Sequence, residues 1–110
     1  MSLFDQEYEG PITITESFLY DIGMKSGPWD DFKYIADITC GYFYSFVVYD
    51  TAELKLIVNF YNRKDSPKLL YFKQVFNTIY FEHELRDIIH TLKSDSNIFY
   101  ETYKHLAHEI

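Results

Sequence analysis

The chain has 110 residues and a formal net charge of −7, with 47% hydrophobic and 20% aromatic residues. This length predicts a single domain, residues 1–110, and the hydrophobic content excludes a wholly disordered chain. The acidic balance argues against a nucleic-acid-binding protein, because the chain has no basic stripe to neutralise phosphates.

The charged residues are unevenly distributed along the sequence. Residues 1–53 contain ten Asp or Glu and two Lys, whereas residues 54–110 contain seven acids and eight bases. Eleven tyrosines and ten phenylalanines accompany this imbalance. A folded surface rich in carboxylates and tyrosines is typical of one that meets a basic partner.

Features that would direct the chain to another compartment are missing from the sequence. Residues 1–10 lack the basic and apolar stretches of a signal peptide, and we expect them to form a loosely held acidic arm. No apolar run approaches the length of a membrane span. The single cysteine, Cys40, cannot form an internal disulfide, which fits a reducing compartment or a secreted protein without disulfides. We therefore expect a cytoplasmic protein that is not attached to a membrane.

The first expected element is a short strand over residues 11–15, where β-branched residues alternate. Residues 17–22 follow, as either a helical turn or a continuation of that strand, and Gly23 ends them. Residues 25–31 are expected to form a loop, because Gly27 and Pro28 punctuate the segment.

From Lys33 the apolar residues recur with a period of two, which predicts antiparallel strands. One strand starts at Lys33 and two more cover residues 42–49 and 54–61, joined by a hairpin at residues 50–53. Residues 62–67 form a second turn before a strand that starts at Leu69. In the first of these strands, four residues are expected to share one face: Tyr34, Ala36, Ile38 and Cys40.

The two faces of this sheet are expected to differ. We place Leu54, Leu56, Val58 and Phe60 toward the helices, which assigns six apolar or aromatic residues to the opposite face: Phe43, Val47, Tyr49, Ile57, Tyr61 and Tyr71. Such an apolar face is covered by the N-terminal segment, with Ile12, Ile14, Phe18 and Tyr20, or by a second copy, or else it binds a partner.

The period changes after residue 80. An apolar stripe at helical spacing runs through Phe81, Leu85, Ile88, Ile89 and Leu92. Residues 94–97 supply the N-cap of a second helix, which contains Phe99, Tyr103, Leu106 and Ile110. Strands followed by helices predict an α+β fold: an antiparallel meander of about four or five strands packed against two C-terminal helices.

Catalytic and metal-binding chemistry find little support. Each predicted helix carries a histidine–carboxylate cluster, one of His83, Asp87 and His90 and one of Glu101, His105 and His108. The helical period turns both clusters toward solvent, away from the residues that would orient metal ligands. Cys40 has no basic neighbour in the sequence to activate it. We expect no metal, no other cofactor and no enzymatic activity, with a small hydrolase as the least favoured alternative.

The expected function is the binding of a basic protein. The candidate contacts are carboxylates in the first strands and their loops, together with aromatic anchors: Asp21, Asp30, Asp31, Asp37, Asp50, Glu53, Tyr20, Trp29, Tyr42 and Tyr44. Trp29 itself either anchors the partner or closes one end of the core.

Two classes of binding protein fit this composition. An immunity protein that blocks a toxin nuclease and an inhibitor that mimics nucleic acid both place carboxylates where phosphates would lie. The alternative is a structural or assembly subunit that uses the aromatic sheet face as an oligomer interface, for example in a homodimer.

Overall fold

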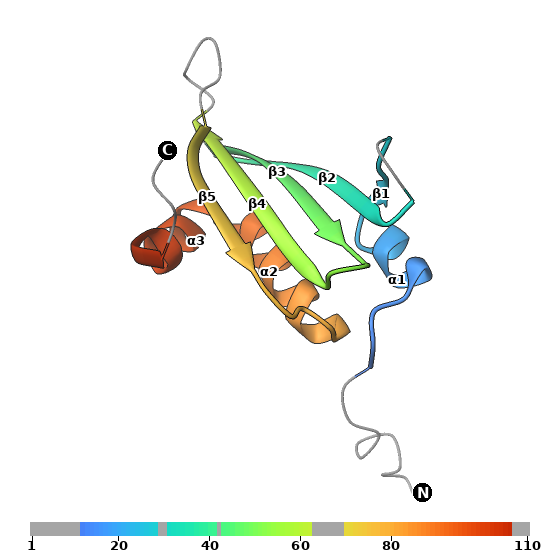
Figure 1. Cartoon of the computed structure of the whole chain (residues 1–110). Helices are drawn as coiled ribbons and strands as arrows, with labels where there is room; N and C mark the ends of the chain where they lie inside the picture. The colour runs from blue at the N-terminus through green and yellow to red at the C-terminus, as the bar shows by residue number, and fades with distance from the viewer. Residues whose placement is uncertain (1–11, 29–30, 42, 63–69, 107–110) are drawn as a thin grey trace, which may run out of the picture.

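The structure, a computed structural model, describes residues 12–28, 31–41, 43–62 and 70–106. The described residues form one antiparallel sheet in which the strand order equals the chain order. Its strands are β1 (Lys25–Ser26), β2 (Lys33–Cys40), β3 (Phe43–Asp50), β4 (Lys55–Asn62) and β5 (Leu70–Phe76). The predicted α+β meander is therefore confirmed (Figure 1).

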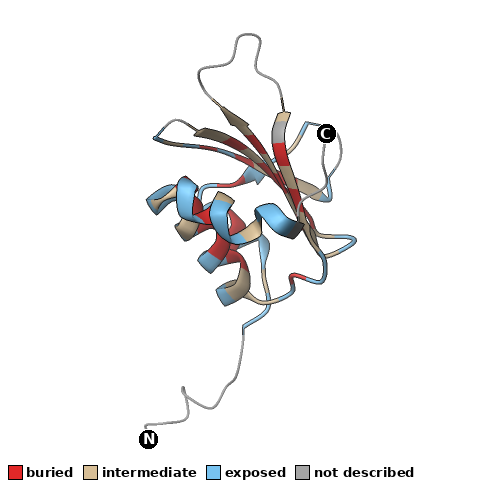
Figure 2. Ribbon diagram, turned by 90° about the vertical axis from the view of Figure 1, so that its left-hand side faces the viewer, coloured by how far each residue is buried: buried red, intermediate tan, exposed pale blue. Residues whose placement is uncertain are grey.

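The helices lie on one side of the sheet, which we call the inner side (Figures 1 and 2). They are α1 (Glu16–Asp21), α2 (Glu82–Ser94) and α3 (Ser96–Tyr103), and a short 3₁₀ turn, Lys104–Leu106, follows α3. Of the two alternatives for residues 17–22, the helical one is confirmed. None of the described helices has the length and apolar character needed to cross a membrane.

The strand predicted over residues 11–15 is wrong for the residues that the structure describes. Thr13 forms a single isolated bridge with Phe81, beside α2, and does not join the sheet. The chain then turns at once into α1, because the Thr15 hydroxyl accepts a hydrogen bond from the Phe18 amide at 3.2 Å. The N-cap interaction thus ends the extended segment after a few residues.

The shared face predicted for β2 is confirmed, whereas the side predicted for the residues of β3 is wrong. Tyr34, Ala36 and Ile38 lie on one face of β2, which is buried toward the helices. However, Val47 pairs directly with Val58 and Tyr49 with Leu56, so Phe43, Val47 and Tyr49 also face inward. The cause is the turn after β3, which sets Asp50 opposite Lys55 and so pairs odd-numbered residues of β3 with even-numbered residues of β4. Of the other residues assigned to that face, Ile57 and Tyr61 do lie on it, and the Tyr71 side chain is outside the described part.

A cluster of aromatic rings occupies the centre of the core. Phe60 is fully buried, with its ring centroid 4.7 Å from that of Phe43, 5.6 Å from Phe72 and 6.1 Å from Phe99. The stripe predicted for the first C-terminal helix is confirmed in α2, which buries Leu85, Ile88, Ile89 and Leu92. Phe99 brings α3 to the same cluster, so Phe60 of β4 joins α3 to the sheet.

Side-chain caps fix where the two C-terminal helices begin. Asp95 accepts hydrogen bonds from the amides of Asn97 and Ile98 at 3.0 and 3.2 Å, which confirms the predicted N-cap of α3. Glu84 accepts from the amides of Phe81 and Tyr80 at 3.0 and 3.1 Å ahead of α2. These two backbone hydrogen bonds lower the pKa of Glu84, because they stabilise its charged form.

Replacing Phe60 by Ala should lower the free energy of unfolding by about 3–5 kcal/mol, because it leaves a cavity where the rings of Phe43, Phe72, Phe99 and Tyr100 converge. Ile98→Ala is the matched control, since Ile98 is 55% exposed on α3 and its loss should change stability by less than about 0.5 kcal/mol. Denaturant unfolding of both variants measures the difference. Equal effects would contradict the central place of Phe60.

Candidate functional site

The predicted contact residues separate into distinct places on the structure. Tyr20 and Asp21 lie on α1, and Asp31 lies just before β2, each exposed. Asp37 and Tyr44 lie together on the outer side of the sheet, where the Tyr44 hydroxyl donates to Asp37. Trp29, Asp30 and Tyr42 lie outside the described residues.

Asp50 and Glu53 belong to the turn between β3 and β4. Asp50 is buried, accepts hydrogen bonds from the amides of Ala52 and Glu53 at 2.9 and 3.1 Å, and lies 3.7 Å from the Lys33 ammonium. The Glu53 carboxylate is exposed and lies 2.8 Å from the ammonium of Lys55. Because its carboxylate is committed to the turn, Asp50 has little left to offer a partner.

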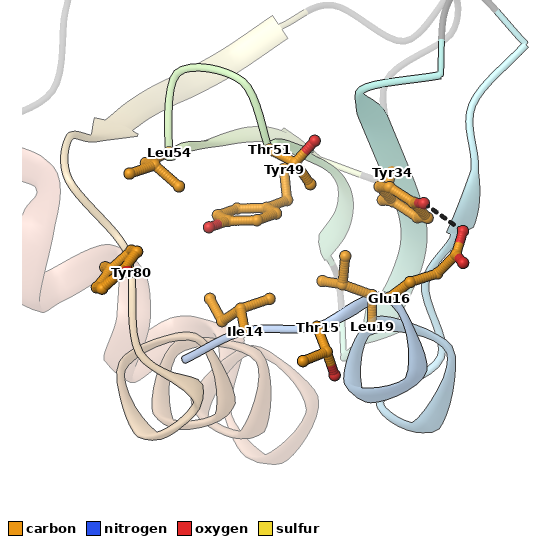
Figure 3. A pocket seen from close by; sticks show the side chains of 9 residues that line it. All are labelled: Ile14, Thr15, Glu16, Leu19, Tyr34, Tyr49, Thr51, Leu54 and Tyr80. Atoms are coloured by element: carbon orange, nitrogen blue, oxygen red, sulfur yellow. Dashed lines mark hydrogen bonds between the residues drawn. The ribbon is translucent and has the colours of Figure 1, made fainter. Parts of the chain in front are cut away.

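A pocket of about 350 Å³ opens at the end of the sheet where β2 begins and β3 ends (Figure 3). We call it the tyrosine pocket, because the rings of Tyr34, Tyr49 and Tyr80 form much of its wall. Its other lining residues come from the segment around α1 and from the β3–β4 turn: Ile14, Thr15, Glu16, Leu19, Thr51 and Leu54. The structure thus gathers residues from four separate parts of the chain around one hollow.

Glu16 supplies a carboxylate at the edge of the tyrosine pocket. Its Oε2 accepts hydrogen bonds from the hydroxyls of Tyr34 at 2.6 Å and Tyr20 at 3.3 Å. Figure 3 shows the bond to Tyr34 on the side of the pocket formed by α1 and β2. A carboxylate can accept about four hydrogen bonds, so Glu16 retains capacity for a donor from another molecule.

The environment of Tyr34 and Tyr49 favours their neutral forms. The hydrogen bond to Glu16, followed by burial and the nearby charge of Asp31, raises the pKa of Tyr34 to about 12. Burial, with the charges of Glu84 and Asp50, raises the pKa of Tyr49 to about 12. The Tyr49 hydroxyl donates to the Ile79 carbonyl oxygen at 2.5 Å. Four carboxylates therefore raise the pKa values of these two tyrosines: Glu16 and Asp31 for Tyr34, and Glu84 and Asp50 for Tyr49. Their negative charge makes this end of the sheet unfavourable for an anion.

Backbone strain is concentrated beside the tyrosine pocket. Leu54 and Thr78 both adopt the left-handed region, with φ of 57° and 61°, which non-glycine residues seldom occupy. The Ile79 amide, next to Thr78, donates to the Leu54 carbonyl oxygen at 2.7 Å and so joins the two strained segments. Strain of this kind is found preferentially at binding and active sites.

The groups considered for catalysis do not converge in the described structure. His83, Asp87 and His90 are exposed on α2, as are Glu101 and His105 near the C-terminus, while His108 lies outside the described residues. Among the described residues, no group of three or more His, Cys, Asp or Glu is placed to hold a metal ion.

A second pocket, of about 340 Å³, lies at the opposite end of β2. Its described lining comprises Cys40, Gly41, Phe43, Asp95, Ser96 and Asn97. No histidine belongs to that lining, so the Cys–His arrangement that a small hydrolase requires is not seen in the described part of the chain.

Comparison of the chain with models of protein families, with curated proteins and with solved structures gives no match.

Sequence reasoning did not single out Glu16, Tyr34, Tyr49 or Tyr80 as site residues. The alternation of strand residues assigned Tyr34 to the sheet without a functional role, and it placed Tyr49 on the opposite, apolar face, for which partner binding was one alternative. One signal was available, because a buried tyrosine needs a partner for its hydroxyl. That requirement points to a nearby carboxylate or carbonyl, which the fold supplies through Glu16 and Ile79.

The raised tyrosine pKa values predict a loss of stability at alkaline pH. A tyrosine whose folded pKa lies near 12, above the ordinary 10.0, contributes its full stabilisation below pH 10. That contribution is lost as the pH rises from about 10 to about 12. Glu16→Gln should lower the pKa of Tyr34 and leave that of Tyr49 at about 12, because the main cause for Tyr49 is burial.

Phenolate absorbance, with ring assignments by NMR, measures this difference. Tyr44, whose pKa is also about 12, serves as an internal control, because burial and Asp37 raise it and Glu16 does not. An unchanged pKa of Tyr34 in Glu16→Gln would contradict the assigned cause.

Proposed function

We propose that the protein is a non-catalytic binding domain that captures a basic protein, with a Lys or Arg side chain of the partner entering the tyrosine pocket. The observation that carries this proposal is the carboxylate of Glu16, hydrogen-bonded to Tyr34, at the edge of a hollow that the rings of Tyr49 and Tyr80 also line. Aromatic faces attract cations, and a nearby carboxylate adds a charge-assisted hydrogen bond.

The surroundings of the pocket support a cationic ligand. Asp21 and Asp31 are exposed, Asp21 on α1 and Asp31 just before β2, and the charge of Asp31 acts on Tyr34. Tyr20 is 49% exposed beside the pocket, with its ring centroid 6.0 Å from that of Tyr34. An exposed tyrosine next to carboxylates is a suitable anchor for a protein interface.

A basic partner of this kind fits an inhibitor role. Nucleases and other nucleic-acid-binding proteins present clusters of Lys and Arg that normally contact phosphates. An acidic domain can occupy such a cluster, and long-range attraction accelerates the encounter. We therefore propose an immunity protein that blocks a toxin nuclease, or an inhibitor that mimics nucleic acid, as the class of function.

Small probes test the pocket directly. N-acetyl-arginine amide and N-acetyl-lysine amide should shift the NMR ring signals of Tyr34 and Tyr80, whereas the uncharged N-acetyl-norleucine amide should not. Glu16→Gln should weaken binding of the cationic probes by about fivefold to tenfold, since it removes the charge and keeps the shape. Glu101→Gln is the matched control, because Glu101 is exposed on α3 and paired with Lys104 at 2.9 Å. Equal binding of the neutral probe, or no effect of Glu16→Gln, would refute a cation-binding pocket.

The partner itself can be sought by affinity capture at low ionic strength. The bound protein should elute along a salt gradient, because surface attraction between opposite charges is screened by salt. The double variant Glu16→Gln/Asp31→Asn should retain much less of it than the wild type, and Glu101→Gln should retain as much. Capture that is insensitive to both salt and the double variant would contradict the electrostatic proposal.

A further inference from the structure

The outer side of the sheet carries a regular pattern of side chains. Directly paired residues form rows across the strands, and one row is aliphatic from β2 to β5, with Ile35, Val48, Ile57 and Val75, while Lys25 of β1 lies beside Ile35 at its edge. The next row runs from Asp37 on β2 through Phe46 and Asn59 to Lys73 on β5. We call these the aliphatic row and the charged-end row.

No described helix covers this side, because α2 and α3 lie against the inner face (Figure 2). Val48 illustrates the consequence, since it is buried among its strand neighbours and yet is not part of the core cluster. Ile35, Ile57 and Val75 are each partly exposed. A continuous aliphatic row on an uncovered sheet face is typical of a surface that packs against another protein.

The charged-end row indicates which protein packs against the outer side of the sheet. It carries an acid at one edge and a lysine at the other, with uncharged residues between them. A two-fold axis parallel to the strands, passing between β3 and β4, exchanges β2 with β5 and β3 with β4. Under this rotation Asp37 of one copy faces Lys73 of the other, and Lys73 faces Asp37. The same rotation places the aliphatic row of one copy on that of the other.

We propose that a second copy of this chain packs on the outer side of the sheet, face to face, through this two-fold axis. Such an interface is isologous: Ile35 meets Val75, Val48 meets Ile57, and each contact occurs twice. The Tyr44 and Tyr61 rings, whose centroids are 5.7 Å apart within one copy, meet the same pair of the other copy in the next row. Aligned sheets pack in this way in β-sandwiches, with a small rotation between their strands.

The size of the face is sufficient for a dimer of moderate affinity. Four strands of this length present roughly 500 Å² at the usual strand spacing and rise, so two copies would bury about 1,000 Å². That value lies near the lower limit of specific interfaces. The dimer should therefore dissociate on dilution.

Solution mass as a function of concentration tests the surface. Light scattering and sedimentation equilibrium should show the wild type passing from monomer to dimer as its concentration rises. Ile57→Lys should remain monomeric over the same range, because it places a charge in the aliphatic row. Ile98→Lys should dimerise like the wild type, since Ile98 lies on α3, away from the outer face. Circular dichroism establishes that both variants are folded.

Charge reversal tests the two-fold axis. Asp37→Lys and Lys73→Asp should each weaken self-association by about tenfold, because each creates two like-charged pairs. Mixing the two variants should restore dimerisation as a heterodimer, in which both pairs are again opposite in charge. The double variant Asp37→Lys/Lys73→Asp should also regain self-association.

Several results would overturn the proposal. A wild type that stays monomeric into the millimolar range excludes the dimer. A dimer that Ile57→Lys leaves intact uses another surface. If Ile57→Lys disrupts the dimer but mixing Asp37→Lys with Lys73→Asp gives no heterodimer, the outer face is the interface and this two-fold arrangement is excluded. The proposal is independent of the tyrosine pocket, since none of these variants alters a residue that lines it.

Discussion

Packing of the C-terminal helices against a single face of the sheet is the constraint on which the other features depend. With helices on one side, the inward residues of β2, β3 and β4 form one core around Phe60, and the outward residues of the same strands remain outside it. The β3–β4 turn sets the pairing between the two strands, and this pairing decides which residues of β3 face inward and which face outward. A single hairpin register therefore determines the composition of both faces.

The tyrosine pocket is a consequence of how this core ends. Tyr34 and Tyr49 are inner-face residues at the end of the sheet. Their neighbours there are residues of the α1 segment and Tyr80. Their hydroxyls would be costly to bury without partners, and Glu16 and Ile79 supply those partners. The pocket lies on the inner side of the sheet and the proposed dimer interface on the outer side, so a dimer would carry two open pockets. A partner with repeated basic groups would then gain from avidity.

The fold was more predictable from the sequence than the site. The period of two from Lys33 and the helical stripe after Phe81 are strong patterns, because each repeats over several residues that must all be buried. The side of β3 that faces inward was predicted wrongly, since it depends on the pairing across one turn and on nothing within the strand. The pocket escaped prediction for a similar reason. Ile14, Tyr34 and Tyr80 are distant in sequence, and a helix capped by Thr15 brings them together.

The equality of strand order and chain order has a kinetic consequence. Each strand of the meander pairs with its neighbour in sequence, so the sheet can form through local hairpins, and such low contact order favours rapid folding. The wall of the tyrosine pocket instead requires Ile14 to reach Tyr80, through the amide of Ile14 and the carbonyl oxygen of Tyr80 at 3.1 Å. That contact closes a loop containing the whole sheet, so its closure costs more chain entropy than any hairpin of the meander. The wall of the pocket therefore depends on a contact between residues much farther apart in sequence than those that pair within the sheet.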